Sequence, residues 1–166
     1  MRSKIGAGIL AGLIAGVVFG LLMHVITVPA PMDGSMPMMT DGREPMMSMM
    51  ARVVRSESLA AGWIYLLVNS VVMGGIFGLV LGERAARIVG GLLWGSLFGI
   101  VLWLLGALLL MPVLLGMEPF APLTMESMRS GTLASLGAHI VCGVVLGGVF
   151  AFLYRGQSAE RLEGRV

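Results

Sequence analysis

The chain has 166 residues, of which 57% are hydrophobic and only 12% are charged, and its formal net charge is +2. A soluble domain carries about a quarter charged residues, so this composition excludes a soluble catalytic domain. Runs of about 20 apolar residues span a bilayer. Four such runs, together with 25 glycines, predict a single all-α integral membrane domain. The one cysteine, Cys142, excludes an intrachain disulfide.

The first predicted span covers about residues 5–28 and follows the basic residues Arg2 and Lys4. The apolar core of a signal peptide is usually about 7–15 residues long, and this run is much longer. Pro31 directly follows the best cleavage candidate, Val28-Pro29-Ala30, and disfavours processing. The sequence therefore predicts a first helix that is retained in the membrane.

The first long loop, residues 29–58, is rich in methionine, with eight in the nineteen residues from Met32 to Met50. Prolines and glycines predict that its first part is irregular. From Pro45 to Arg55 apolar residues recur with helical spacing, and Pro45 suits a first helical turn. The pattern predicts a short amphipathic helix at the membrane interface. Its apolar side is expected to hold Met46, Met50, Val53 and Val54.

Three further spans are predicted at about residues 59–81, 88–112 and 132–154. The connection from Gly82 to Arg87 is short, which predicts that the second and third spans are antiparallel neighbours. A proline-containing second loop, residues 113–131, precedes the last span. The polar tail, residues 155–166, is expected to fray.

The distribution of basic residues predicts the orientation of the chain, because cytoplasmic loops are enriched in lysine and arginine. Seven lie in the N-terminus, the Gly82–Arg87 turn and the tail: Arg2, Lys4, Arg84, Arg87, Arg155, Arg161 and Arg165. Four lie in the two long loops: Arg43, Arg52, Arg55 and Arg129. We therefore expect both termini in the cytoplasm and both long loops on the outer side.

The two halves of the sequence resemble each other. Three glycines of the first span, Gly8, Gly12 and Gly16, match Gly91, Gly95 and Gly99 of the third at an offset of 83 residues, as Pro29 matches Pro112. Residues 55–60 resemble residues 129–134 at an offset of 74. The pattern predicts two helical hairpins related as parallel repeats. Small residues at every fourth position form GxxxG-type faces, where helices of this bundle or another subunit approach closely.

Methionine is concentrated on the predicted outer side, where eleven of the fifteen lie. Soft thioethers select Cu(I) or Ag(I) over harder ions. The candidate metal ligands are Met36, Met38, Met39, Met46, Met47, Met49, Met50, Met125 and Met128. The alternative is that methionine is a flexible apolar filler at an interface or docking surface.

Two histidines lie within the predicted spans, His24 in the first and His139 in the fourth. They are candidate axial ligands of a haem b, or part of a metal path with Met23 and Met111. The alternative is that each imidazole is neutral and hydrogen-bonded between helices.

The predicted spans contain no Asp, Glu, Lys or Arg, so they lack the carboxylate relay of proton-coupled transporters. The sequence also contains no phosphate-binding loop, nucleophile elbow or HExxH helix. We therefore expect no enzymatic activity. We also expect the chain to lie in a lipid bilayer and to bind no nucleic acid.

The second hairpin resembles a known family. Trp103, the segment Leu110–Gly116 and the segment Ser135–His139 are similar to those of the small YagU-like inner-membrane proteins, and the likeness covers mainly residues 90–152. The resemblance implies a four-span protein of a prokaryotic plasma membrane and no particular reaction. The methionine-rich loop is a departure from that family.

Three functional hypotheses follow from the sequence. The first is a non-enzymatic accessory or assembly subunit, which docks on other membrane subunits or on itself through glycine-rich faces and the methionine-rich loop. The second is a Cu(I)-binding protein that delivers copper to an extracytoplasmic partner such as an oxidase. The third is a haem b carrier that uses His24 and His139.

Overall fold

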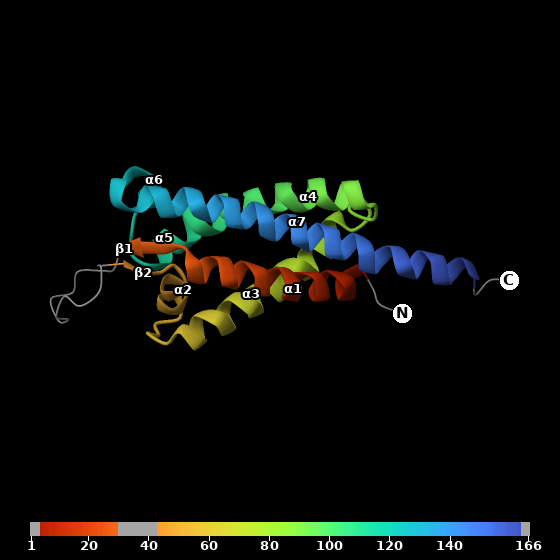
Figure 1. Cartoon of the computed structure of the whole chain (residues 1–166), viewed down its shortest axis with the longest axis horizontal. Coiled ribbons are helices and arrows are strands. Elements are labelled where there is room, and N and C mark those ends of the chain that lie inside the picture. The colour runs from red at the N-terminus through yellow and green to blue at the C-terminus, as the bar shows by residue number, and fades with distance from the viewer. Residues whose placement is uncertain (1–3, 30–42, 164–166) are drawn as a thin grey trace.

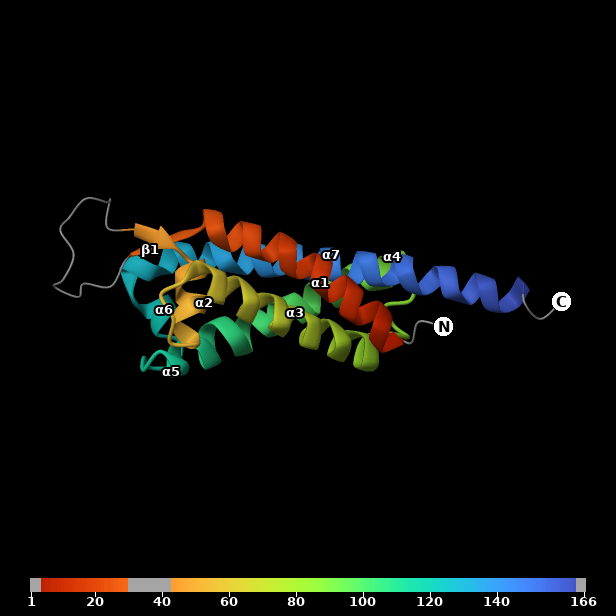
Figure 2. The ribbon, with the colours of Figure 1, turned by 90° about the horizontal axis from the view of Figure 1, so that it is seen from below.

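The computed structural model describes residues 4–29 and 43–163, with side chains described as far as Tyr154. Its long helices run side by side along one axis, and α1 begins at the same end at which α7 finishes (Figure 1). Short elements gather at the opposite end in both views (Figures 1 and 2), and we call this the distal end.

Four helical segments are long and apolar enough to cross a membrane, which confirms the prediction of an all-α multi-pass protein. The first two are α1 (Lys4–Val25) and α3 (Leu59–Leu81). The third is one continuous segment, Ile88–Leu114, made of α4 (Ile88–Leu102), the π-helix η1 (Trp103–Leu110) and α5 (Met111–Leu114). The fourth is the part Glu126–Tyr154 of α7 (Glu126–Glu163).

Two helices, the first and the last, differ from their predicted bounds. The first helix stops at Val25, short of residue 28, because Thr27–Pro29 form strand β1. The last helix begins at Glu126, inside the predicted second loop, and continues to Glu163 through the segment expected to fray. The long helix α7 therefore spans the whole length of the bundle (Figure 1).

The helices pack as two hairpins, α1 with α3 and α4 with α7, and the hairpins meet through α1 and α7. Helices α3 and α4, although joined by the short turn, have few close backbone contacts, and they meet mainly where the rings of Phe77 and Phe98 lie edge to face (centroids 5.4 Å apart). The prediction that they pack as neighbours is wrong because a short turn constrains only the helix ends, whereas the glycine faces direct each helix to another partner.

Glycine allows the backbones within each hairpin to meet. A Cβ on Gly8 would collide with the carbonyl oxygen of Gly74, and a Cβ on Gly91 would collide with that of Gly147. Such close approach lets dispersion and weak Cα–H···O contacts accumulate. The glycine faces predicted from sequence are thus buried inside the two hairpins.

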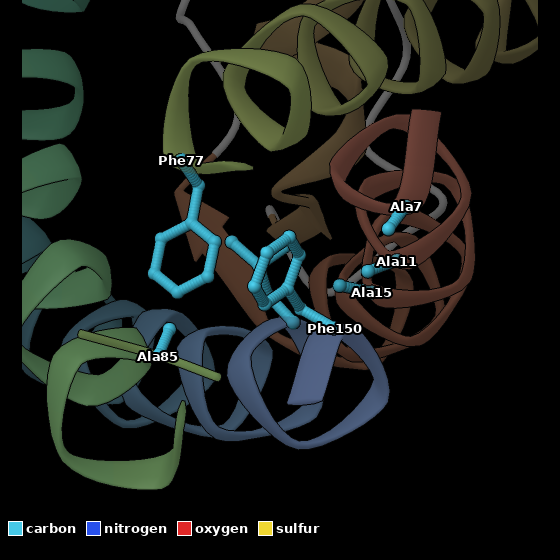
Figure 3. Packing of buried hydrophobic residues seen from close by; sticks show 7 residues of the cluster. Ala7, Ala11, Ala15, Phe77, Ala85 and Phe150 are labelled. Atoms are coloured by element: carbon cyan, nitrogen blue, oxygen red, sulfur yellow. The ribbon is translucent and has the colours of Figure 1, made fainter. Parts of the chain in front are cut away.

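Aromatic rings fill the space between the hairpins toward the end that carries the termini. Phe77 from α3 and Phe150 from α7 lie edge to face, with ring centroids 5.5 Å apart (Figure 3). The small side chains of Ala7, Ala11 and Ala15 on α1 belong to the same buried cluster and leave room for the rings.

Two short strands and short helices build the distal end. Strand β1 pairs antiparallel with β2 (Arg43–Pro45), α2 (Met47–Val53) follows β2, and α6 (Ala121–Thr124) precedes α7. The predicted short helix thus occurs, but strand β2 takes its first residue. Its buried side chains are Met47, Met49 and Ala51, not those of the predicted apolar side.

Candidate functional site

Seven methionine residues line one small cavity at the distal end. The cavity has a volume of about 30 Å³. Its methionines are Met23, Met46, Met49, Met50, Met111, Met117 and Met128, and its other walls are Ala107, Pro112, Pro122, Thr132, Ser135 and His139. We call this space the methionine cavity. It can hold a water-sized particle, and it is small enough that a single ion would touch several walls.

One side of the methionine cavity comes from α1 and the segment around α2. Met23 is fully buried on α1, and the Met46 N–H donates a hydrogen bond to the carbonyl oxygen of Ile26 just beyond α1 (2.8 Å). This bond fixes the turn that brings Met46 beside the end of α1. Helix α2 then presents Met49 and Met50 to the same space.

An ion pair fixes α2 against the short sheet. Arg52 Nη2 donates to Glu44 Oε2 (2.7 Å), and Arg52 Nη1 lies 2.6 Å from Glu44 Oε1 without hydrogen-bond geometry. Arg43 donates in turn to the side chain and carbonyl of Thr27, each at 3.0 Å. These contacts link β1, β2 and α2 into one unit, which closes one side of the methionine cavity.

The opposite wall comes from the π-helical segment and depends on Pro112. Proline has no N–H, so Pro112 leaves the carbonyl oxygen of Leu108 without its α-helical partner. The Phe120 N–H from the following loop donates to this carbonyl instead (2.8 Å), and the Met111 N–H bonds five residues back to Gly106. The altered helix brings Ala107, Met111 and Pro112 to the cavity. Such π-helical segments are frequent at functional sites.

Helix α7 supplies a polar wall whose hydroxyl groups already have partners. Thr132 Oγ1 donates to the Met128 carbonyl (2.9 Å), and Ser135 Oγ donates to the Thr132 carbonyl (2.7 Å). Trp103 Nε1 donates to Ser135 Oγ (3.0 Å). The hydroxyls therefore stabilise the wall. The thioether sulfurs of the surrounding methionines are left as the side-chain atoms that can coordinate an ion.

His139 adds to this wall one ring nitrogen that can coordinate an ion. Its Nδ1 lies 2.7 Å from the Ser135 carbonyl oxygen. Since a carbonyl only accepts, Nδ1 carries the hydrogen, which leaves the Nε2 lone pair free as a ligand. The ring packs edge to face on Phe19, with centroids 4.5 Å apart.

The other predicted haem ligand lies elsewhere. His24 is exposed in the last turn of α1 and lines neither this cavity nor the larger one described below. Met23, one residue earlier, is the side chain of that turn that faces the cavity. The structure thus does not bring the two histidines to a common cavity.

The predicted methionine ligands divide into three groups. Met46, Met49, Met50 and Met128 line the cavity. Met47 is fully buried but packs between α2 and Gly62 of α3, and Met125 is exposed. Met36, Met38 and Met39 lie outside the described residues.

Three further methionines complete the cavity. Sequence reasoning places Met23 and Met111 on a path with the histidines, whereas it gives Met117 only a place in the second loop. The proline directly after Met111 is the available signal that the helix is locally altered there, but its effect on Met117 depends on the fold.

Thioethers are the donor set that the cavity offers. Within the part of the chain that the structure describes, no three His, Cys, Asp or Glu side chains come together as a metal-binding group. Thioether sulfurs suit soft monovalent ions such as Cu(I) and Ag(I) much better than Mg²⁺ or Ca²⁺.

A second, larger cavity lies between α1, α3, the α4–η1–α5 segment and α7. Its volume is about 330 Å³, and it shares Met50, Ala107, Met111 and His139 with the methionine cavity. It occupies the region where α3 and α4 diverge. The thiol of Cys142, on its wall, donates to the Ala15 carbonyl (3.6 Å).

The fold and the site together define a multi-pass helical membrane protein with a thioether-lined cavity at one end of its bundle. Comparison with protein-family models, with curated proteins and with solved structures found no match to this chain.

Proposed function

We propose that this protein binds Cu(I), and its analogue Ag(I), in the methionine cavity and presents the ion to a partner. The observation that supports this proposal is that seven methionine residues, from four separate stretches of the chain, line one space of about 30 Å³.

The coordination would come from thioethers on opposite walls. Met46, Met49 and Met50 belong to the α2 side, Met111 and Met117 to the π-helical side, and His139 Nε2 offers a nitrogen at the border with the larger cavity. Methionine side chains are unbranched and adaptable, so three or four can close on one ion. The ion would remain exchangeable, because neutral thioethers bind it without a compensating negative charge.

We infer that the methionine cavity faces the outer side of a prokaryotic plasma membrane, with both termini in the cytoplasm. The support is the sequence distribution of lysine and arginine, with seven in the N-terminal segment, the Gly82–Arg87 turn and the tail against four in the two long loops. Helix α2 would then lie at the outer interface as a short amphipathic element. An ion would enter from outside, and a soluble or membrane-bound partner would collect it there.

We also infer that the chain arose by duplication of a helical hairpin. Equivalent contacts in the two hairpins support this inference: Gly8 meets Gly74 as Gly91 meets Gly147, and Gly12 meets Ser70 as Gly95 meets Gly143. A parallel repeat would make α1 equivalent to α4 and α3 equivalent to α7. The two long loops would then be equivalent connections, which together supply most of the methionine ligands.

A second candidate function is an accessory or assembly subunit of a larger membrane complex or a homo-oligomer. The glycine faces are occupied within the hairpins, so docking would use other surfaces. The exposed side chains of Phe120 and Met125 at the distal end favour contact with a partner there. This role is compatible with copper delivery. A haem b carrier is the weakest proposal, because the two histidines lack a common cavity.

The experiment is a Cu(I) titration of the purified full chain in detergent, under reducing anaerobic conditions and in competition with a chromophoric Cu(I) chelator. We expect one tightly bound Cu(I) per chain. The double variant Met49→Leu/Met128→Leu removes one sulfur from α2 and one from α7, and leucine for methionine preserves volume. Its affinity should fall at least about tenfold, roughly 1.4 kcal/mol.

Met47→Leu is the matched control, because Met47 lies in the same helix and is buried but lines no part of the cavity. Its affinity should equal that of the natural chain. The copper proposal is wrong if the natural chain binds no Cu(I), or if the control and the double variant bind it equally.

A further inference from the structure

The larger cavity has the size and character of a small-molecule site. Its volume of about 330 Å³ lies within the range of about 300–1,000 Å³ that ligand pockets occupy. Its lining is mainly apolar, with the aromatic rings of Phe19 and Phe98 among the walls, and it contains no charged side chain. The backbones of α3 and α4 diverge beyond the contact between Phe77 and Phe98, so the space lies where a molecule dissolved in the bilayer can enter between the two helices.

One face of α3 carries polar groups into this cavity. Tyr65, Asn69 and Met73 are four residues apart, so they share a face of the helix, and all three line the cavity; Tyr65 and Met73 are half-buried, and Asn69 is exposed at its open edge. The Tyr65 hydroxyl and the Asn69 amide make no hydrogen bond to another residue in the described part of the chain. An amide without a partner within an apolar helix is costly in a membrane, where water does not replace the missing bond.

The spacing of these groups restricts the ligand. Four residues of α-helix advance about 6 Å along the axis, so Tyr65 and Asn69 offer two hydrogen-bond donors at separate heights of one wall. The uncharged lining disfavours a phospholipid headgroup or a carboxylate, because burying an isolated charge is expensive. A flat ring that carries two carbonyl oxygens meets both donors and packs on the aromatic and aliphatic walls.

We propose that the cavity between α3 and α4 binds an uncharged lipid-soluble molecule of the quinone class, with Tyr65 and Asn69 donating hydrogen bonds to its carbonyl oxygens. This site is distinct from the methionine cavity, although Met111 and His139 border both. The proposal does not depend on copper binding. A plain acyl chain would leave the Asn69 amide unpaired, which is why an alkyl chain alone is the less suitable occupant.

The test uses the metal-free full chain, purified in detergent, depleted of endogenous lipid-soluble molecules and titrated with decylubiquinone. Binding is followed by quenching of tryptophan fluorescence. We expect saturation at one quinone per chain. Asn69→Leu, which replaces the amide by an apolar group, and Tyr65→Phe should each weaken binding about tenfold, as the loss of one hydrogen bond to the ligand predicts.

Ser96→Ala is the matched control. Ser96 is a polar residue of a spanning helix that lies outside the cavity and bonds its own helix backbone at Leu92 (2.8 Å). This variant should bind decylubiquinone as the natural chain does. Circular dichroism of each variant establishes that its helices are retained, so that a change in binding reflects the site.

Three results would overturn the proposal. The first is quenching that rises without saturation, or that is equal in Asn69→Leu and the natural chain. The second is a tightly retained phospholipid that decylubiquinone does not displace, which would assign the space to an acyl chain. The third is a dimer of the natural chain that becomes monomeric in Asn69→Leu, which would assign the Asn69 amide to contact with a second copy.

Discussion

Replacing Gly95 by alanine should separate α4 from α7 and destabilise the second hairpin. A Cβ at this position would lie 3.0 Å from the carbonyl carbon of Gly143 and 3.0 Å from Gly147 Cα, and closer still to the Gly143 carbonyl oxygen. All these atoms belong to backbone, so no side chain can rotate away. Relief requires the two helices to move apart, which weakens the close contacts along the whole interface.

The magnitude follows from two opposing effects. Alanine is favoured over glycine within a helix by up to about 1 kcal/mol, whereas overpacking of a tight interior costs typically about 1–3 kcal/mol. Gly137→Ala isolates the first effect, because Gly137 lies on α7 and a Cβ added there would meet no neighbouring atom within 4 Å. The difference between the two variants should therefore be about 1–3 kcal/mol, with Gly95→Ala the less stable.

The assay is reversible unfolding of the purified chain in mixed micelles, with helix content followed by circular dichroism as the denaturing detergent increases. The free energy of unfolding is compared among the natural chain, Gly95→Ala and Gly137→Ala. Equal stability of the two variants would refute the close packing of α4 on α7.

Two further predictions concern the ends of the bundle. Pro112→Ala restores an N–H that can bond the Leu108 carbonyl and so releases the Phe120 amide. Hydrogen exchange at the Phe120 amide should therefore accelerate, and the affinity for Cu(I) should fall as Met111 moves. An unchanged exchange rate at Phe120 would contradict the role of Pro112. At the other end, the Lys4 ammonium hydrogen-bonds Glu83 and holds the pKa of that carboxyl below its usual value. The stability that this ion pair contributes is therefore present at neutral pH and lost as the pH falls through the lowered pKa of Glu83. Glu83→Gln should unfold at a lower temperature than the natural chain at neutral pH, and the two unfolding temperatures should converge in acid. A difference that persists in acid would contradict this pH dependence.

The unequal contacts between the hairpins account for the position of both cavities. If the halves are repeats, the α1–α7 interface and the α3–α4 interface are equivalent, yet only the first is closed. The second stays open toward the distal end, where the methionine cavity adjoins it through Met111 and His139. A soft ion and an apolar ligand would therefore share a wall, and occupancy of one site would influence the other through that wall.

The candidate site was only partly predictable. The clustering of Met46, Met49 and Met50 in a short helix, and the softness of their sulfurs, are apparent from the residues alone. Sequence reasoning does not separate Met47, which points to α3, from its neighbours, because the direction of a short helix depends on what packs against it. Nor does it place Met117 in the cavity, since that depends on how the loop folds back on the helix end, where the Met117 N–H donates to the Pro112 carbonyl (2.8 Å).

The four apolar helices and the glycine faces follow directly from the order of residues. Their length, hydropathy and four-residue repeat are local properties, and a bilayer stabilises a long apolar segment as a helix whatever it packs against. The pairing of the helices, the divergence of α3 from α4 and the meeting of seven distant methionines emerge only when the whole chain packs. These outcomes depend on contacts between residues far apart in the chain, such as Gly95 with Gly143 and Met46 with Ile26. Local periodicity indicates which face of a helix is small or apolar, but the packing of the complete bundle selects the partner of that face.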